Sequence, residues 1–104
     1  MTGQWDEGVQ HLRRALAVDV ASPEAHNTLG SIFLRKQDFI GARAELQEAI
    51  RLKPDFAFAH YNLGLAHRAL GDGGSARQEF ETVLAIDPQF AAARSAIDRL
   101  PPVR

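Results

Sequence analysis

Four histidines supply the imidazole groups with which this 104-residue sequence could bind a transition metal. The sequence has no cysteine, which excludes thiolate metal sites, disulfides and cysteine nucleophiles. His26 and His60 stand 34 residues apart, and His67 follows His60 by seven. Zinc needs three or four ligands that converge on one point. These spacings do not predict such a group, so we expect no metal and no other cofactor.

The glycine-rich segment Gly71-Asp72-Gly73-Gly74-Ser75 has the composition of a phosphate-binding loop. It lacks the Gly-Lys-Ser/Thr ending and the preceding strand that such a loop requires, and a turn between helices explains it better. No Ser/His/Asp arrangement suggests nucleophilic catalysis, and no pair of carboxylates stands out from solvated helix faces. We therefore predict that the protein is not an enzyme.

Composition narrows the class of protein further. Twelve Lys and Arg against 13 Asp and Glu give a formal net charge of −1, which argues against nucleic-acid binding. No apolar run approaches the ~20 residues of a membrane span, so membrane insertion is not expected. The first residues lack the basic-then-apolar order of a signal peptide, which favours a cytoplasmic location.

Internal repetition organises the chain. Residues 23–56 and 57–90 align without a gap, and ten of the 34 positions are identical. The identical pairs are Ala25/Ala59, His26/His60, Leu29/Leu63, Gly30/Gly64, Asp38/Asp72, Ala42/Ala76, Arg43/Arg77, Glu45/Glu79, Pro54/Pro88 and Phe56/Phe90. The same period continues outward on both sides, so the repeat fills a single domain, 1–104.

Each unit has the pattern of two helices. Leu29 and Phe33 follow helical spacing in its first half, and Leu46 and Ile50 follow it in the second. No segment shows the alternating pattern of a strand, so the predicted fold class is all-α. Six helices are expected, near residues 4–18, 23–36, 39–52, 57–70, 74–86 and 89–100.

Start and stop signals support these helices. Ser22-Pro23-Glu24 combines a capping hydroxyl, a proline at the first helical position and an acidic residue in the first turn. Asp55 is expected to cap the next unit in the same way. Pro54 and Pro88 end the second helix of each unit.

The 34-residue unit resembles the tetratricopeptide repeat. The resemblance rests on His26-x-x-Leu29-Gly30-x-x-Phe33 with Ala42, Leu46, Ala49 and Pro54, and on His60-x-x-Leu63-Gly64-x-x-His67 with Ala76, Phe80 and Pro88. The family usually has a large aromatic residue where His26 and His60 stand, so these histidines are interpreted as packing residues. The resemblance implies an α-α superhelix of about six antiparallel-paired helices with a concave surface.

Glycine and alanine predict where the paired helices approach each other. Gly30 and Gly64 lie in mid-helix, where glycine costs about 1 kcal/mol relative to alanine. The matching residues on the second helices are Ala42 and Ala76, which are also small. Small residues on both helices allow a close approach of the helix axes, so Gly64→Leu is expected to disrupt the second unit.

The family's concave face is lined by the first helix of each unit. The residues that packing leaves free on these helices are the candidate peptide-binding groove: Asn27, Ser31, Arg35, Phe58, Tyr61, Asn62, Leu65, Arg68 and Arg99. Phe58, Tyr61 and Leu65 form an apolar group that the core motif does not require, and such groups often mark contact sites. Asn62 can both donate to and accept from a peptide backbone. The expected function is a non-catalytic protein–protein interaction scaffold that binds a short peptide in this groove.

Charge suggests the chemistry of the partner. The first helices of the units carry more basic than acidic residues, which favours a peptide partner with an acidic or apolar segment. The family's carboxylate clamp for chaperone tails needs a particular set of Lys, Asn and Arg. Ala92 and Ala96 stand where that clamp has basic residues, so a chaperone tail is not the expected ligand.

The repeat phase divides the domain into a half repeat at 1–22 that holds only a second helix, full repeats at 23–56 and 57–90, and a capping helix with a tail at 91–104. Arg94 and Asp98 replace the histidine and glycine of the motif, which predicts a solvated outer face for the last helix.

At the other end, Trp5, Gly8 and Leu12 are expected to face a missing first helix. Either the chain is cut from a longer array, or a second copy covers this end in a homodimer, with Trp5 and Leu12 in the self-association face. The alternative function is a stabilising or regulatory segment of a larger enzyme or of a secretion or assembly protein.

Overall fold

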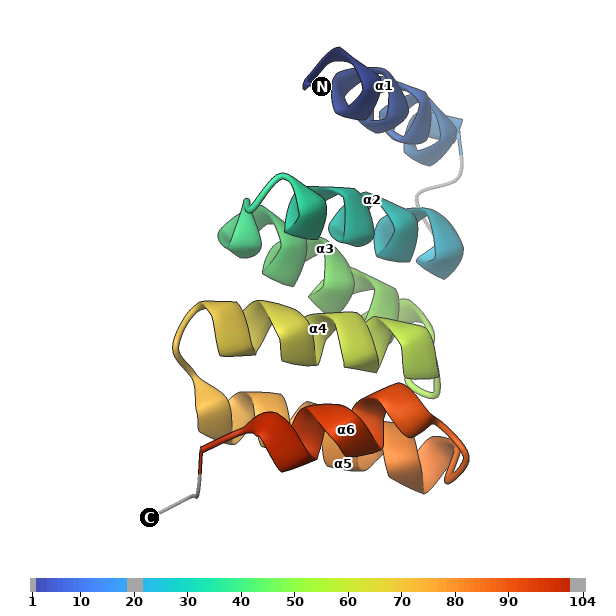
Figure 1. The fold of residues 1–104 in the computed structure, drawn as a ribbon. Coiled ribbons are helices and arrows are strands. Elements are labelled where there is room, and N and C mark those ends of the chain that lie inside the picture. Colours follow the sequence, from blue (N-terminus) through green and yellow to red (C-terminus); the bar gives the residue numbers. More distant parts are fainter. Residues whose placement is uncertain (1, 19–21, 102–104) are drawn as a thin grey trace.

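Six helices make up the part of the chain that the structure describes (Figure 1). The computed structural model describes the backbone of residues 2–18 and 22–101 and the side chains of 6–15 and 22–101. The helices are α1 (Thr2–Val18), α2 (Pro23–Arg35), α3 (Phe39–Leu52), α4 (Ala57–Ala69), α5 (Gly73–Ile86) and α6 (Ala91–Arg99). This order confirms the predicted all-α fold, and α6 begins two residues later than expected.

The helices stack in chain order into an elongated molecule of 42 × 28 × 20 Å. Helix α2 pairs with α3, and α4 pairs with α5, while α2 also contacts α4. Figure 1 looks onto the face formed by α2, α4 and α6, with α3 and α5 behind them. The first helices of successive units therefore line one face, which is called the concave face below.

Three helices begin at a side-chain cap that the sequence supplies. Ser22 Oγ accepts the backbone N–H of Ala25 at 3.1 Å, as the sequence predicted. Asp38 and Asp72, which are 34 residues apart, cap α3 and α5 in the same way, each at 3.0 Å. The backbone N–H of Ser75 holds the pKa of the Asp72 carboxyl below its usual value. The prediction for Asp55 is wrong, because the N-cap residue of α4 is Phe56, which forms no side-chain cap hydrogen bond.

The turn inside each unit requires a left-handed residue. Gly71 has φ +84° in the second unit, and Gln37 has φ +63° at the same position of the first. In both turns the next backbone N–H reaches back to the last turn of the preceding helix, from Asp38 to Phe33 O and from Asp72 to His67 O, both at 2.9 Å. The glycine-rich segment is therefore a helix-to-helix turn, as expected.

Close packing within each unit depends on the two mid-helix glycines. A Cβ added at Gly64 would lie 2.5 Å from Phe80 Cε1, and one added at Gly30 would lie 2.6 Å from Leu46 Cγ. Phe80 and Leu46 are fully buried, so neither ring nor branch has space to move away. Because glycine has no side chain at this point of the first helix, a large side chain of the second helix can pack there.

The core divides into two clusters that follow the repeat. The first lies between α3 and α4 and contains Ala42, Leu46, Leu63 and Ala66. The second joins α5 to α6 and contains Ala76, Phe80, Val83, Ala93, Ala96 and Leu100. Alanine supplies half of these buried positions, which lets neighbouring helices pack closely along the whole stack.

Helix α1 packs against α2 through a face that includes Gly8 and Val9. A Cβ added at Gly8 would lie 3.2 Å from Ile32 Cδ1, and Val9 is buried. Gly8 therefore contacts the helix that follows α1, and whether it would also face a preceding helix stays a prediction. Leu12 is half-buried, and the side chain of Trp5 lies outside the described residues.

Substitution of Gly64 tests the packing of the second unit. We expect Gly64→Leu to destabilise the protein by about 3 kcal/mol, because the new side chain must displace a fully buried ring. In a domain of this size, that loss lowers Tm by about 10 °C or more in a thermal melt followed by circular dichroism. The matched control is Gly73→Ala, since a Cβ at Gly73 meets no atom within 4 Å. Equal Tm values for the two variants would contradict the packing described.

Candidate functional site

Two asparagines join neighbouring helices on the concave face. Asn62 Nδ2 of α4 donates to Asn27 Oδ1 of α2 at 3.1 Å, and both residues are half-buried. Helical spacing places both side chains on the concave face, and the repeat brings α2 and α4 side by side there. Each amide group has further donors and acceptors, which can bond to the backbone of an extended peptide.

Aromatic rings cluster beside the asparagine pair. Phe58 of α4 is 61% exposed, and its ring packs edge-on against Phe90 with centroids 5.2 Å apart. Tyr61 lies between Phe90 and the buried Phe80, at 5.3 and 5.7 Å between centroids. Tyr61 and Leu65 also pack against the α5–α6 core. Of the apolar group that the sequence predicted, only Phe58 is therefore strongly exposed.

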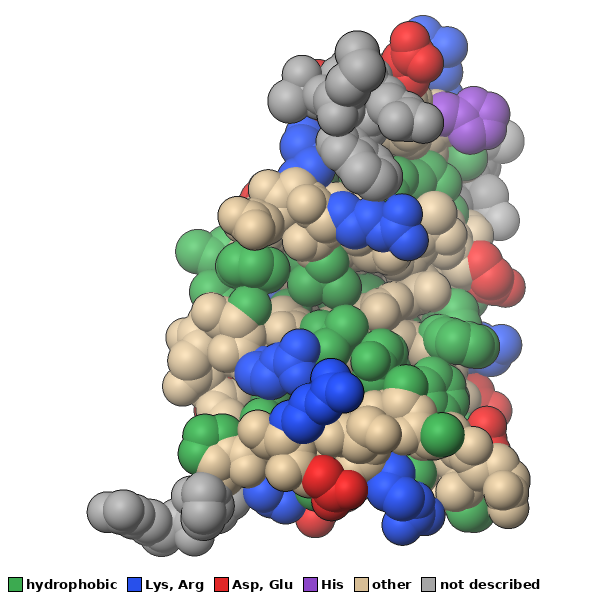
Figure 2. All heavy atoms as spheres, in the orientation of Figure 1, with side chains coloured by type: hydrophobic (Ala, Val, Ile, Leu, Met, Phe, Trp, Pro, Cys, Tyr) green, Lys and Arg blue, Asp and Glu red, His purple; other side chains and the backbone are tan. Residues whose placement is uncertain are grey.

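Basic residues lie at the opposite end of α4. Arg68 and Arg99 line a cavity of about 280 Å³ together with Tyr61, Ala92, Ser95 and Ala96. Figure 2 shows basic side chains side by side over α4 and α6, next to apolar side chains of the same face. Ser31 is half-buried and Arg35 is exposed on α2, and neither lines this cavity.

Each full unit contains a histidine paired with a glutamate, and the histidine is half-buried in the first unit and buried in the second. His26 Nδ1 lies 2.8 Å from Glu45 Oε1, and His60 Nδ1 lies 2.7 Å from Glu79 Oε1. The side chains of His26 and His60 are 13% and 10% exposed, which confirms that they occupy packing positions. This pairing was not predicted from the sequence. The signal was present, because the histidine and the glutamate are identical in the two units and 19 positions apart in each.

Both ring nitrogens of His60 are engaged. Its Nε2 lies 2.7 Å from the carbonyl oxygen of Pro54, which is an acceptor like the Glu79 carboxylate. The ring therefore joins α4, α5 and the turn before α4, and it has no nitrogen left for a metal.

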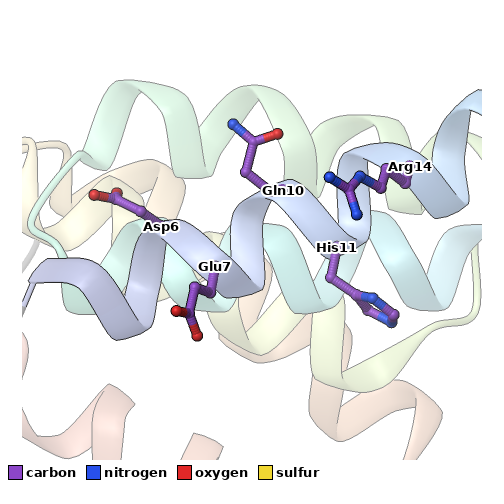
Figure 3. Close-up of a pocket in the computed structure, with 5 residues that line it drawn as sticks. All are labelled: Asp6, Glu7, Gln10, His11 and Arg14. Carbon is purple, nitrogen blue, oxygen red and sulfur yellow. The ribbon is translucent and has the colours of Figure 1, made fainter.

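A larger cavity, of about 560 Å³, lies over α1 (Figure 3). All the residues that line it come from this one helix and are exposed: Asp6, Glu7, Gln10, His11 and Arg14. Their charges are of both signs and do not converge on one point. Among the described side chains no three His, Asp or Glu residues are placed to hold a metal ion. Within the described residues, no helix is long and apolar enough to span a membrane.

Comparison with known families agrees with this architecture. Residues 30–71 match the family model described as "TPR repeat", and residues 57–90 match "Tetratricopeptide repeat". The chain belongs to the tetratricopeptide repeat family. It is 31% identical over 95 residues to the Hsp70-Hsp90 organizing protein of Triticum aestivum, and 42% identical over 71 residues to the TPR repeat-containing protein PA4299 of Pseudomonas aeruginosa. These matches cover 91% and 68% of the chain but only 16% and 29% of the relatives' lengths.

Solved structures include similar domains. The second TPR domain of the human RPAP3 protein, determined in complex with the HSP70 peptide SGPTIEEVD, is 26% identical to this chain with a TM-score of 0.88. The match covers 94% of this chain and 82% of that domain. The fold of the chain is therefore that of a TPR domain, and the chain spans a small part of the length of its curated relatives.

Substitution of Glu79 tests the histidine pair. We expect Glu79→Ala to lower the free energy of unfolding by about 1 to 2 kcal/mol, because the buried His60 Nδ1 loses its partner. Chemical denaturation at neutral pH measures the change. The control is Glu81→Ala, which removes an exposed carboxylate from the same helix and is expected to have an effect within about 0.5 kcal/mol. Equal effects of the two substitutions would show that the pair does not stabilise the fold.

Proposed function

We propose that this domain is a non-catalytic interaction module that binds a short, extended peptide segment across its concave face. The observation that carries the proposal is Phe58, a large apolar side chain that is 61% exposed on this face. Its ring packs on Phe90, so it is held in place and loses little conformational entropy when a partner covers it.

The asparagine pair supplies the polar part of the proposed site. Asn62 and Asn27 lie on neighbouring helices and hold each other by one hydrogen bond. An extended peptide that runs along α4 beside α2 would find amide donors and acceptors already oriented toward it, while its side chains contact Phe58. Groups that are already oriented favour binding because they lose little conformational entropy when the peptide binds.

A related domain supports the proposal by analogy. The RPAP3 domain, which has the same fold, was solved with a bound HSP70 peptide. In our sequence Ala92 and Ala96 stand where the family's chaperone-tail clamp has basic residues, so we propose a different peptide as the ligand.

The alternative role is that of a stabilising or regulatory segment in a larger enzyme or in a secretion or assembly protein. It is favoured by the small share of its curated relatives that the chain spans. In that case the concave face would contact another part of the same protein or assembly. Self-association through α1, with Trp5 and Leu12 in the contact, is a third proposal, and sedimentation at increasing protein concentration tests it.

Peptide selection tests the leading proposal. We expect the domain to enrich specific sequences from a displayed library of random dodecapeptides, and the double variant Tyr61→Ala/Asn62→Ala to lose at least about tenfold in affinity for them. The matched control is Thr82→Ala/Gln78→Ala on the opposite helix, α5, which should bind as the unmodified domain does. Failure to enrich any sequence, or equal binding by both double variants, would overturn the assignment of the groove.

A further inference from the structure

The cavity between α4 and α6 has a size and lining that suit one peptide side chain. Its floor on α6 is made by the short side chains of Ala92, Ser95 and Ala96, which share one helical face. Its volume of about 280 Å³ lies below the usual range for sites that enclose a whole small molecule. The lining combines the hydroxyl groups of Tyr61 and Ser95 with two guanidinium groups and two alanine methyl groups.

Two arginines give this cavity its charge. Arg68 lies in the last turn of α4 and Arg99 in the last turn of α6, and both are exposed. Among the described residues neither guanidinium forms an ion pair or a side-chain hydrogen bond. A guanidinium group matches a carboxylate in shape and charge and binds it through paired N–H donors. None of the residues that line the cavity is acidic, so its charge is complementary to that of an acidic group.

A purely structural reason for these arginines also exists. Cations in the last turn of a helix interact favourably with its dipole, and both arginines occupy that position. That effect acts on each helix separately, and it does not require the two side chains to line one cavity. A purely structural role predicts that replacing both arginines changes stability alone. A binding role predicts that it also changes the affinity for acidic peptides.

The distance from Phe58 sets a spacing for the ligand. Phe58 and Arg68 are ten residues apart on α4, which corresponds to about 15 Å along the helix axis. An extended peptide advances about 3.3 Å per residue, so about four or five residues cover this distance. Asn62 lies between the two positions, where the peptide backbone would pass.

We propose that the α4–α6 cavity is an acidic subsite that receives an Asp or Glu side chain of the bound peptide between Arg68 and Arg99. An apolar side chain four or five residues away contacts Phe58. This inference rests on the proposed peptide-binding function and specifies the chemistry of the ligand.

The test uses the random dodecapeptide library with carrier sequence on both sides of each peptide, so that a free terminal carboxylate is absent. We expect enriched sequences to pair an acidic residue with an aromatic or aliphatic residue at the stated spacing. Synthetic peptides from this set, amidated at the C-terminus, are then compared with versions in which Glu is replaced by Gln. The Gln version should bind about tenfold to a hundredfold more weakly.

A double-mutant cycle assigns the effect to the cavity. In Arg68→Gln/Arg99→Gln the Glu and Gln peptides should bind equally, because the carboxylate has lost its partners. The charge-matched control is Arg13→Gln/Arg51→Gln, whose arginines lie on α1 and α3, and it should keep the difference between the peptides. Thermal melts of both double variants verify that they are folded at the assay temperature.

The outcomes separate the two proposals. Enriched peptides without an acidic residue, or a Glu-to-Gln difference that persists in Arg68→Gln/Arg99→Gln, would overturn the acidic subsite and leave the peptide groove standing. A lowered Tm with unchanged peptide discrimination would assign the arginines to the helix dipole alone. A library that yields no binding sequence would overturn both proposals.

Discussion

The contact between a mid-helix glycine and a large buried side chain is the constraint on which this structure depends. Gly64 leaves room for Phe80, and Gly30 leaves room for Leu46, so the two helices of each unit lie close together. This contact uses one face of each first helix. The opposite face of α2, α4 and α6 is then free of packing within the unit, and the regular stacking places these faces side by side. The concave face is thus a consequence of how the units are held together.

A second set of contacts repeats with the same period and varies in chemistry. His60 bonds to the Pro54 carbonyl, and Arg94, 34 residues later, lies 3.5 Å from the Pro88 carbonyl through its Nη2. Position 26 carries a histidine paired with Glu45. In the family this position usually holds a large aromatic residue, which stabilises the unit by apolar packing. In this chain, polar side chains occupy these positions and connect neighbouring helices and turns through hydrogen bonds.

The fold could be predicted because its determinants are local in sequence and occur twice. Identical glycines, alanines and prolines at a 34-residue spacing define the helix pairs, and Ser22 marks a helix start by its chemistry alone. Predictions failed where a residue's surroundings depend on a neighbouring unit. Asp55 is of a residue type that caps helices, but the turn places Phe56 at the N-cap position of α4. Tyr61 and Leu65 look free within their own helix, yet the next unit covers them.

The most direct test of this account is nuclear magnetic resonance mapping of the backbone amides during titration with a selected peptide. The account predicts that the largest chemical-shift changes fall on α4 and α6, around Phe58, Asn62 and Arg68, with smaller changes on α2. Amides of α3 and α5 that face away should remain near their original positions. Changes concentrated on α3 and α5, or on the exposed side of α1, would contradict the claim that repeat packing creates the binding surface on the concave face.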